Sequence, residues 1–289
     1  MPDSLGQADV QGLDIDKLIK GFADDEFVFK NFLTVTPTSH REIRWFQNLT
    51  ANTLDSTDTS GVTASQVPLA AFGTLPPIAE FSTTRMTSYV KHFLIGSPLF
   101  TYADIKDSDP DMFAANLRGL TRGIQNQVDI RILDVLSATC LLSGSAAGTG
   151  WADATNGNPF MDLLSGATEI RKKGYDITNV VAWVHPDQYK NLFNYFVTTK
   201  GSSVPVFASG KVDTGVITKI ANVGIVVTNN ATAGQVMMIV PQRAATWKTF
   251  TPLSTAVEDK PAIGTKITVW EDGDVIFTDP NAAYLLKLV

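Results

Sequence analysis

Hydrophobic residues recur every three or four positions in the middle of the chain, and this spacing predicts one long helix from Asp109 to Leu142. Asp109 can cap its first turn, and Pro110 suits the first helical position. Such a helix would be about 50 Å long, whereas globular helices typically reach about 20 residues at most. Its length therefore predicts a spine, a coiled coil or a membrane span. The expected apolar stripe comprises Phe113, Leu117, Leu120, Ile124, Val128, Ile132 and Val135.

The polar residues of this helix narrow the three alternatives. Their charges exclude a membrane span, which needs about 20 nearly uncharged residues. Strand-like sequence on both sides argues against a free coiled coil, so we predict a spine. Gly119 and Gly123 predict close packing or a bend. The side opposite the stripe is expected to carry Arg118, Arg122, Gln125, Asp129 and Arg131.

The sequence before the helix predicts two strands separated by a long polar excursion. Ile43 to Phe46 and Phe81 to Leu94 are strand-like, whereas residues 50–65 are rich in Ser and Thr and residues 67–78 carry three prolines. The arrangement fits a long two-stranded arm or an ordinary β-meander inside the core. An isolated hairpin is marginal in water, so an arm would need a neighbouring surface.

The sequence after the helix predicts mixed helices and strands without regular βαβ alternation, which indicates an α+β fold. Residues 143–150 are Gly-rich but lack the Gly-Lys-Ser/Thr of a phosphate loop, so we predict a hinge or linker. Asn158 and Pro159 begin a helix that Gly174 ends, and His185 precedes a third helix over 186–196. The expected strands are Val180–Val184, a hairpin of 223–228 with 235–240 around Asn229-Asn230, a hairpin of 266–270 with 275–278 turned by residues 271–274, and a last element over 283–288.

The composition of the chain narrows the classes of function that it could have. The chain has 289 residues, 44% of them hydrophobic, which suffices for a large core or two domains. A net charge of −6 and a pI of about 5.0 argue against a basic nucleic-acid-binding surface, although not against a protein that encloses nucleic acid. Cys140 is the only cysteine and is predicted to be a buried, inert thiol. No signal peptide is visible at the start.

Residues that could carry catalysis do not converge in the sequence. His40, His92 and His185 lie far apart along the chain, and none has metal-ligand spacing with another histidine or cysteine. No Gly-x-Ser-x-Gly motif and no distinctive acidic pair is present. We therefore predict no catalytic, cofactor-binding or metal-binding residues, no cofactor, and a protein that is not an enzyme.

Three groups of motifs, taken in their order, resemble the major capsid proteins of tailed phages and related viruses, which have the Hong Kong 97 fold. Each motif is a packing signature that is weak alone, and their joint order carries the resemblance. The motifs are Ala167–Tyr175 followed by Val180–Tyr189, Gly224–Thr228 followed by Gln235–Val240, and Val275–Tyr284.

The resemblance implies a division of the chain that gives each unusual segment a role. An extended β-hairpin, the E-loop, would lie across a neighbouring subunit, and the long helix would be the spine of a peripheral domain. The implied parts are an N-terminal arm (1–30), the E-loop and flanking strands (31–90), the peripheral domain with the spine (91–143), an axial domain (144–248) and strands returning to the peripheral domain (249–289).

The resemblance also implies function. The chain would be a structural subunit that self-assembles through hexamers and pentamers into an icosahedral viral head. That head would enclose double-stranded DNA without sequence-specific binding, assemble in the host cytoplasm, and use no membrane. Portal, scaffolding or decoration proteins are possible partners. An encapsulin-type bacterial compartment shell and an α+β enzyme of unrecognised activity remain as alternatives.

Two departures from the family pattern give further expectations. Some members crosslink an E-loop lysine to a neighbouring asparagine, but no lysine lies between Lys30 and Lys91. We therefore predict a shell without covalent E-loop crosslinks. The residues before Phe32 are too few for the N-terminal scaffolding domain of some members, which implies a separate scaffolding protein or none.

Overall fold

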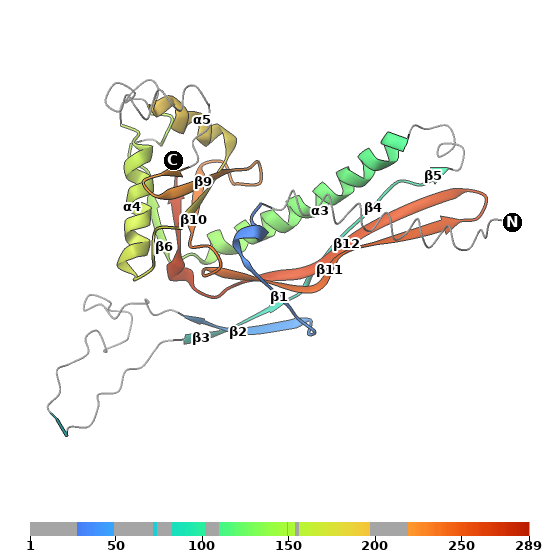
Figure 1. The fold of residues 1–289 in the computed structure, drawn as a ribbon, viewed down its shortest axis with the longest axis horizontal. Coiled ribbons are helices and arrows are strands. Elements are labelled where there is room, and N and C mark those ends of the chain that lie inside the picture. The colour runs from blue at the N-terminus through green and yellow to red at the C-terminus, as the bar shows by residue number, and fades with distance from the viewer. Residues whose placement is uncertain are drawn as a thin grey trace. The chain divides into compact units, whose positions relative to one another are not determined.

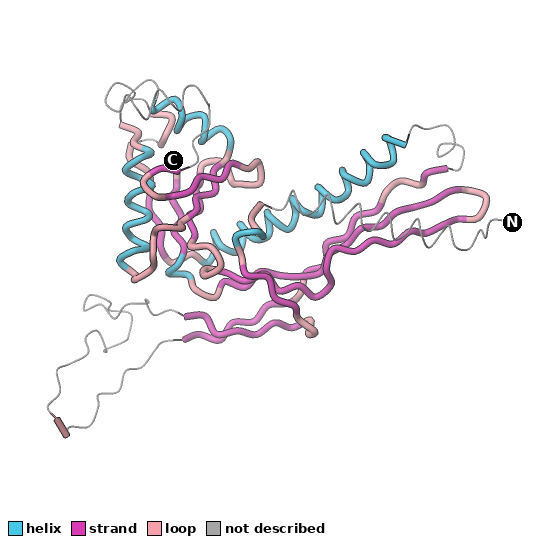
Figure 2. The backbone as a smooth tube through the Cα atoms, viewed as in Figure 1, coloured by secondary structure: helices cyan, strands magenta, loops and turns pink. Residues whose placement is uncertain are grey.

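Two compact units make up the chain, and each combines segments that are distant in sequence. The computed structural model describes residues 28–48, 72–73, 83–101, 110–148, 150–153, 156–196 and 219–288. Among these, the first unit comprises residues 28–43, 88–101, 110–132 and 247–275, and the second comprises the others. Figures 1 and 2 show the elements described below.

A sheet of long strands forms the base of the first unit. Its strand order is β1-β11-β12-β4, and β5 also pairs with β12. The turn between β11 and β12 places Ala262 at φ 62°. The strands are β1 (Thr34–Pro37), β4 (Lys91–Gly96), β5 (Phe100–Thr101), β11 (Ala245–Lys260) and β12 (Gly264–Phe277).

The predicted hairpin of 266–270 with 275–278 is wrong. Strand β12 runs without a break through residues 271–274, and its hairpin partner is β11. On its other side β12 pairs antiparallel with β4, so that Glu271 lies opposite Phe93 and Gly273 opposite Lys91. The acidic residues expected in a turn therefore lie inside a strand.

The long helix is confirmed as α3 (Pro110–Thr139), which is 30 residues long. Leu117, Ile124, Val128 and Ile132 of the predicted stripe are buried. The helix continues through both glycines, and a Cβ added at Gly123 would lie 3.5 Å from Ile95 of β4. Gly123 thus permits close packing.

Two residues expected on the solvent side of α3 are buried instead. Gln125 is 1% exposed and Asp129 is 0% exposed. The expectation was wrong for these two because the buried sector of the helix is wider than its apolar stripe. Arg118 and Arg122 are exposed as predicted, and Arg131 is half-buried.

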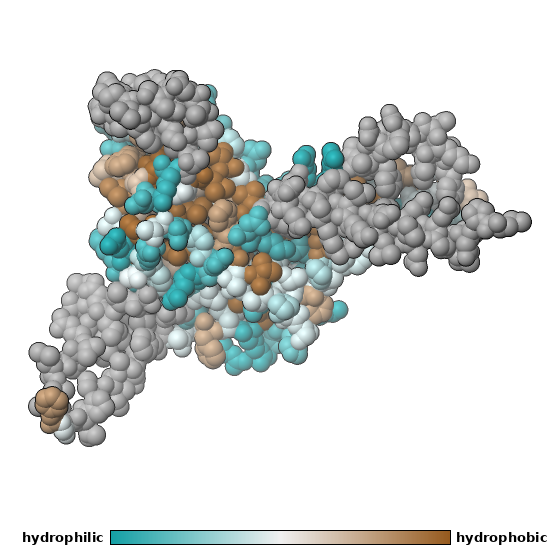
Figure 3. Space-filling view, in the orientation of Figure 1, coloured by the Kyte–Doolittle hydropathy of each residue, from teal (hydrophilic) through white to brown (hydrophobic). Residues whose placement is uncertain are grey.

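A six-stranded sheet with the order β6-β13-β10-β7-β9-β8 forms the core of the second unit. Helix α4 (Pro159–Lys172) packs on β13. In Figure 3, hydrophobic residues gather in the region of β9 and β10. The strands are β6 (Leu142–Ser145), β7 (Val181–Val184), β8 (Lys219–Ile220), β9 (Val223–Val227), β10 (Gln235–Ile239) and β13 (Ala283–Lys287).

Two predictions for this sheet are wrong. Strands β9 and β10 do not form a hairpin, because β7 lies between them, parallel to β9 and antiparallel to β10. The start of the predicted Gly-rich linker is strand β6, which pairs parallel with β13. A Cβ at Gly144 would lie 2.1 Å from the Tyr284 hydroxyl, so even alanine at this position of β6 would displace the tyrosine ring.

The ends of the helices in the second unit agree with the sequence. The Asn158 side chain caps α4 by accepting a hydrogen bond from the Met161 N–H at 3.3 Å. Gly174 follows the helix with φ 86°, a left-handed conformation that glycine adopts at no steric cost. His185 caps α5 (Pro186–Asn194) in the same way as Asn158 caps α4. Phe160, in the first turn of α4, is 39% exposed.

The two strands that flank the polar excursion pair with each other in a sheet of their own. These are β2 (Glu42–Asn48) and β3 (Thr83–Tyr89), which favours the arm over the core meander. Trp45 Nε1 and Gln47 Nε2 each donate to the Phe277 carbonyl oxygen at 3.2 Å. The predicted N-terminal arm up to residue 27, and the tip of the hairpin apart from residues 72–73, lie outside the described residues.

Candidate functional site on strand β12

Three acidic side chains of β12 lie close together in the first unit and are removed from water. Glu271 and Asp274 are 0% exposed, and the Asp272 side chain is 14% exposed. Burying an ionised carboxylate costs several kcal/mol unless it is paired and hydrogen-bonded. We call residues 271–274 the acidic segment. It can exist inside a strand only because other elements bring partners to it.

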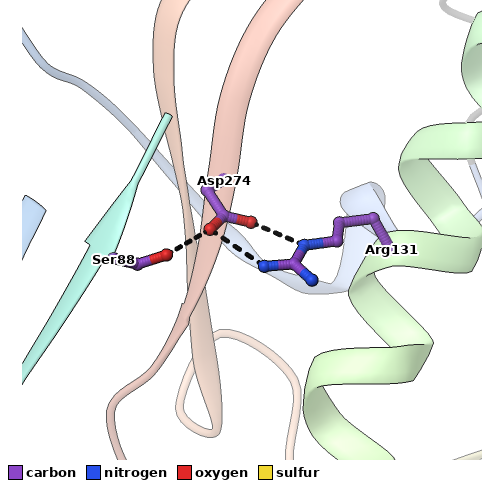
Figure 4. A network of polar contacts seen from close by, with 3 residues as sticks. All are labelled: Ser88, Arg131 and Asp274. Atoms are coloured by element: carbon purple, nitrogen blue, oxygen red, sulfur yellow. Dashed lines mark hydrogen bonds and ion pairs between the residues drawn. The ribbon is translucent and has the colours of Figure 1, made fainter. Parts of the chain in front are cut away.

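Asp274 receives a two-point contact from the spine. Arg131 of α3 donates from Nε to Oδ1 at 3.0 Å and from Nη2 to Oδ2 at 3.2 Å. The hydroxyl of Ser88, at the end of β3, donates to Oδ2 at 2.5 Å (Figure 4). Bidentate guanidinium–carboxylate pairs are among the stronger charge-assisted contacts. This contact joins α3, β3 and β12.

Glu271 is matched by a cation from the start of the described chain. Lys30, in the short 3-10 helix η1 (Lys30–Phe32), bonds through Nζ to Oε1 of Glu271. The same ammonium lies 5.5 Å from the ring centroid of Trp247, within cation–π range. Phe93 of β4 packs against this ring, with centroids 6.4 Å apart.

The remaining carboxylate has a more exposed partner. His92 Nδ1 contacts Oδ1 of Asp272, and the His92 side chain is 57% exposed. Exposed ion pairs contribute about 0–1 kcal/mol, so this contact adds little stability. His92 is the only one of the three histidines in the acidic segment's contacts. His185 caps α5, and the His40 N–H contacts the Thr38 hydroxyl.

Gly273 lets the strand pass between these contacts. A Cβ built there would lie 2.6 Å from Cζ2 of Trp247 and 2.7 Å from the carbonyl oxygen of Lys248. Both distances are below those seen for real Cβ atoms, and one partner is backbone. The sequence Glu-Asp-Gly-Asp thus places acidic residues around a position where only glycine fits.

The acidic segment is a structural junction. It holds the start of the described chain, the end of hairpin strand β3, strand β4 and the spine against one strand. Within the described ranges, no group of three or more His, Cys, Asp or Glu side chains is arranged to hold a metal ion. None of the helices so described is both long and apolar enough to cross a membrane. No residue of this junction was predicted from the sequence, where the available signal was a group of acidic residues within an otherwise strand-like run.

A second polar cluster lies in the second unit. Tyr175 donates its hydroxyl to Oδ2 of Asp279 at 2.6 Å, and Arg243 Nε lies 3.6 Å from the same oxygen. Burial raises the pKa of Asp279, while the Tyr175 hydrogen bond and Arg243 oppose this. Burial, followed by the contact with Asp279, also raises the pKa of Tyr175. The cluster joins the loops after α4, after β10 and after β12.

The cysteine is half-buried, where the sequence predicted a buried thiol, and its surroundings disfavour the thiolate. Cys140 follows α3 and donates to the Leu142 carbonyl oxygen at 3.1 Å. Burial raises the pKa of Cys140 to about 11. At pH 8 we therefore expect iodoacetamide to alkylate the native thiol about 100-fold more slowly than the urea-unfolded chain, because the thiolate is the nucleophile. Mass spectrometry over a time course measures both rates, and equal rates would contradict this assignment.

The sequence as a whole identifies the class of protein that carries this junction. A sequence model of the phage capsid protein family matches residues 99–286, which is more than half of the chain. The chain belongs to the phage capsid protein family. This capsid subunit is a structural protein of the virion and not an enzyme, and its copies assemble into the capsid shell. A search of curated proteins gave no match.

Solved structures show that the capsid subunit has the Hong Kong 97 type of fold, as the sequence motifs predicted. It is similar to the virus-like particle of Pyrococcus furiosus at 9% identity, with a TM-score of 0.64 over 96% of this chain and 99% of that one. It is similar to a chain of Mycobacterium phage Che8 at 14% identity, with a TM-score of 0.61 over 90% of this chain and 91% of that one. It is also similar to the SrpI encapsulin of Synechococcus elongatus at 11% identity, with a TM-score of 0.57 over 89% of this chain and 85% of that one.

Proposed function

We propose that copies of this chain form hexamers and pentamers, which non-covalent contacts hold together in the icosahedral head of a virus. This head encloses double-stranded DNA. The observation that carries this proposal is the match of residues 99–286 to the phage capsid family. The junction on β12 supports it, because a shell subunit needs its projecting parts fixed to a rigid strand. Assembly would take place in the host cytoplasm, with portal, scaffolding or decoration proteins as further partners.

The domain division inferred from the resemblance remains part of this proposal. The E-loop would lie across an adjacent subunit, which would cover apolar residues that the single chain exposes. Phe46 of β2 is 68% exposed and Tyr89 of β3 is 62% exposed. Large aromatic residues are enriched in the buried centres of protein interfaces. Their exposure on paired strands supports a subunit contact at the base of the hairpin.

The charge of the chain supports a container for DNA. A net charge of −6 disfavours strong neutralisation of phosphates, so binding to the shell wall would be weak and independent of sequence. The test is nuclease treatment of intact particles from infected or induced cells. We expect protected double-stranded DNA of uniform length. Particles that hold a protein cargo and no protected DNA would support the encapsulin-type alternative instead.

That alternative rests on one observation, the likeness to the SrpI encapsulin at a TM-score of 0.57. An encapsulin-type shell would use the same subunit fold around enzymes. The family match favours the viral function. The contents of the particle therefore separate two functions that the fold alone leaves open.

We expect mature particles to dissociate fully into single chains on a denaturing gel. No lysine lies between Lys30 and Lys91, so an isopeptide bond from an E-loop lysine cannot form. Boiled, reduced particles should give one band near 31.2 kDa for this chain. A ladder of dimers and higher multiples that survives denaturation would contradict the non-covalent shell.

A further inference from the structure

Residues 28–33, where the described chain begins, are anchored in the first unit by two buried side chains. Phe29 is 0% exposed and Leu33 is 4% exposed. The segment turns through η1 and continues into β1, which pairs with β11. It therefore forms part of the packed unit, even though it lies at the base of the predicted arm.

One attachment of this segment is to the spine. Asp129 is buried in the middle of α3, and its carboxylate accepts two backbone N–H groups of the segment. Oδ2 accepts from Val28 at 3.3 Å and Oδ1 from Phe29 at 3.2 Å. Hydrogen bonds to an ionised acceptor are stronger than neutral ones. Opening the segment would take both donors from a carboxylate that water does not reach.

The other attachment is to the acidic segment of β12. Lys30 supplies the cation for Glu271, whose Oε2 is buried without a hydrogen-bond partner among the described residues. The Lys30 side chain is 15% exposed and Glu271 is fully buried. Removing one partner of a buried ion pair leaves an uncompensated charge, which is strongly destabilising. The lysine and the two backbone donors thus hold adjacent residues of one segment to two different elements.

We propose that residues 28–33 form a latch that fixes the base of the N-terminal arm to the spine and β12 in every subunit. Because opening the latch strips partners from two buried carboxylates, residues 28–33 are expected to keep the same path in every subunit. The latch is a property of the single subunit. Its consequence for arm placement in the shell rests on the proposed function.

Hydrogen exchange measured by mass spectrometry on the full-length chain tests the latch. For Lys30→Met we expect exchange of the amides in residues 28–33 to become about 100-fold faster, since the charge of Glu271 loses its partner. Exchange in β7 (Val181–Val184) should stay unchanged, because opening is local. Lys172→Met removes an exposed pair with Glu169 and serves as the control, with no change in either peptide.

A double variant separates the latch from general destabilisation. In Lys30→Met/Glu271→Met neither charge of this pair remains, so no unpaired charge is left at position 271 and exchange in residues 28–33 should return to within a few-fold of the original chain. If Lys30→Met does not accumulate as folded protein, the double variant decides, and a folded, protected segment supports the latch. Unchanged exchange in Lys30→Met, an equal increase in β7, or no recovery in the double variant would overturn it.

Discussion

Replacing Arg131 by methionine is expected to destabilise the first unit by about 3–5 kcal/mol. Asp274 is fully buried, and Arg131 supplies both of its charged contacts, at 3.0 and 3.2 Å. Methionine keeps much of the side-chain volume but leaves the carboxylate with the Ser88 hydroxyl as its remaining donor in the junction. Urea denaturation of the purified chain, followed by tryptophan fluorescence, measures the loss.

A matched substitution on the same helix controls for the loss of an arginine as such. Arg118 lies on the exposed side of α3. Arg118→Met is expected to change the free energy of unfolding by less than about 0.5 kcal/mol, as is usual for surface positions. Equal losses at the two positions, or no loss at Arg131, would show that the contact with Asp274 does not stabilise the subunit.

Gly273→Ala is expected to have the second large effect, a loss of about 3 kcal/mol in the free energy of unfolding. The added methyl group would lie 2.6 Å from the Trp247 ring and 2.7 Å from the Lys248 carbonyl oxygen. Relief would require moving a buried tryptophan or separating two paired strands. The soluble yield and the urea midpoint of the variant report the loss.

Gly119→Ala is the matched control for this prediction. Its Cβ would meet nothing within 4 Å, and the residue lies in the interior of α3. Alanine has a higher helix propensity, so this variant should gain about 1 kcal/mol. Opposite signs at the two glycines are expected. A loss at Gly119, or a neutral Gly273→Ala, would contradict the packing described here.

Local sequence was sufficient for elements whose signals are local. The start of α3 at Pro110, the Asn158 cap and the turn at Gly174 follow from side chains that act within one helical turn. The same local rules failed for residues 271–274. Asp-Gly is a common turn dipeptide, but here the partners lie 143 to 241 residues away along the chain. No window of sequence contains Lys30, Ser88 and Arg131 together.

The predicted strand pairing in the six-stranded sheet was wrong for a related reason. Asn229-Asn230 correctly indicates a turn, but a turn does not determine whether the two strands that it joins pair with each other. Strand β7 lies between β9 and β10 and pairs parallel with β9. Parallel strands need a long crossover connection, and the segment between β7 and β9, which contains α5, provides one. Likewise, Asp129 on α3 was expected in solvent because its chemistry is polar, whereas its donors come from the segment around Phe29.

The residues of the junction could not be predicted from the sequence, although the family of the protein could. The family resemblance, which the family match confirms, was carried by the motifs at 167–175, 180–189, 224–228, 235–240 and 275–284. They are packing signatures of the sheet and its helix. The charged contacts of β12 connect elements whose adjacency appears only once the chain is folded.

Negative-stain electron microscopy of the purified chain, across a range of salt, pH and protein concentration, tests whether its copies assemble into a shell. We expect closed, hollow shells of uniform diameter under at least one of these conditions. A monodisperse monomer under every condition would contradict it.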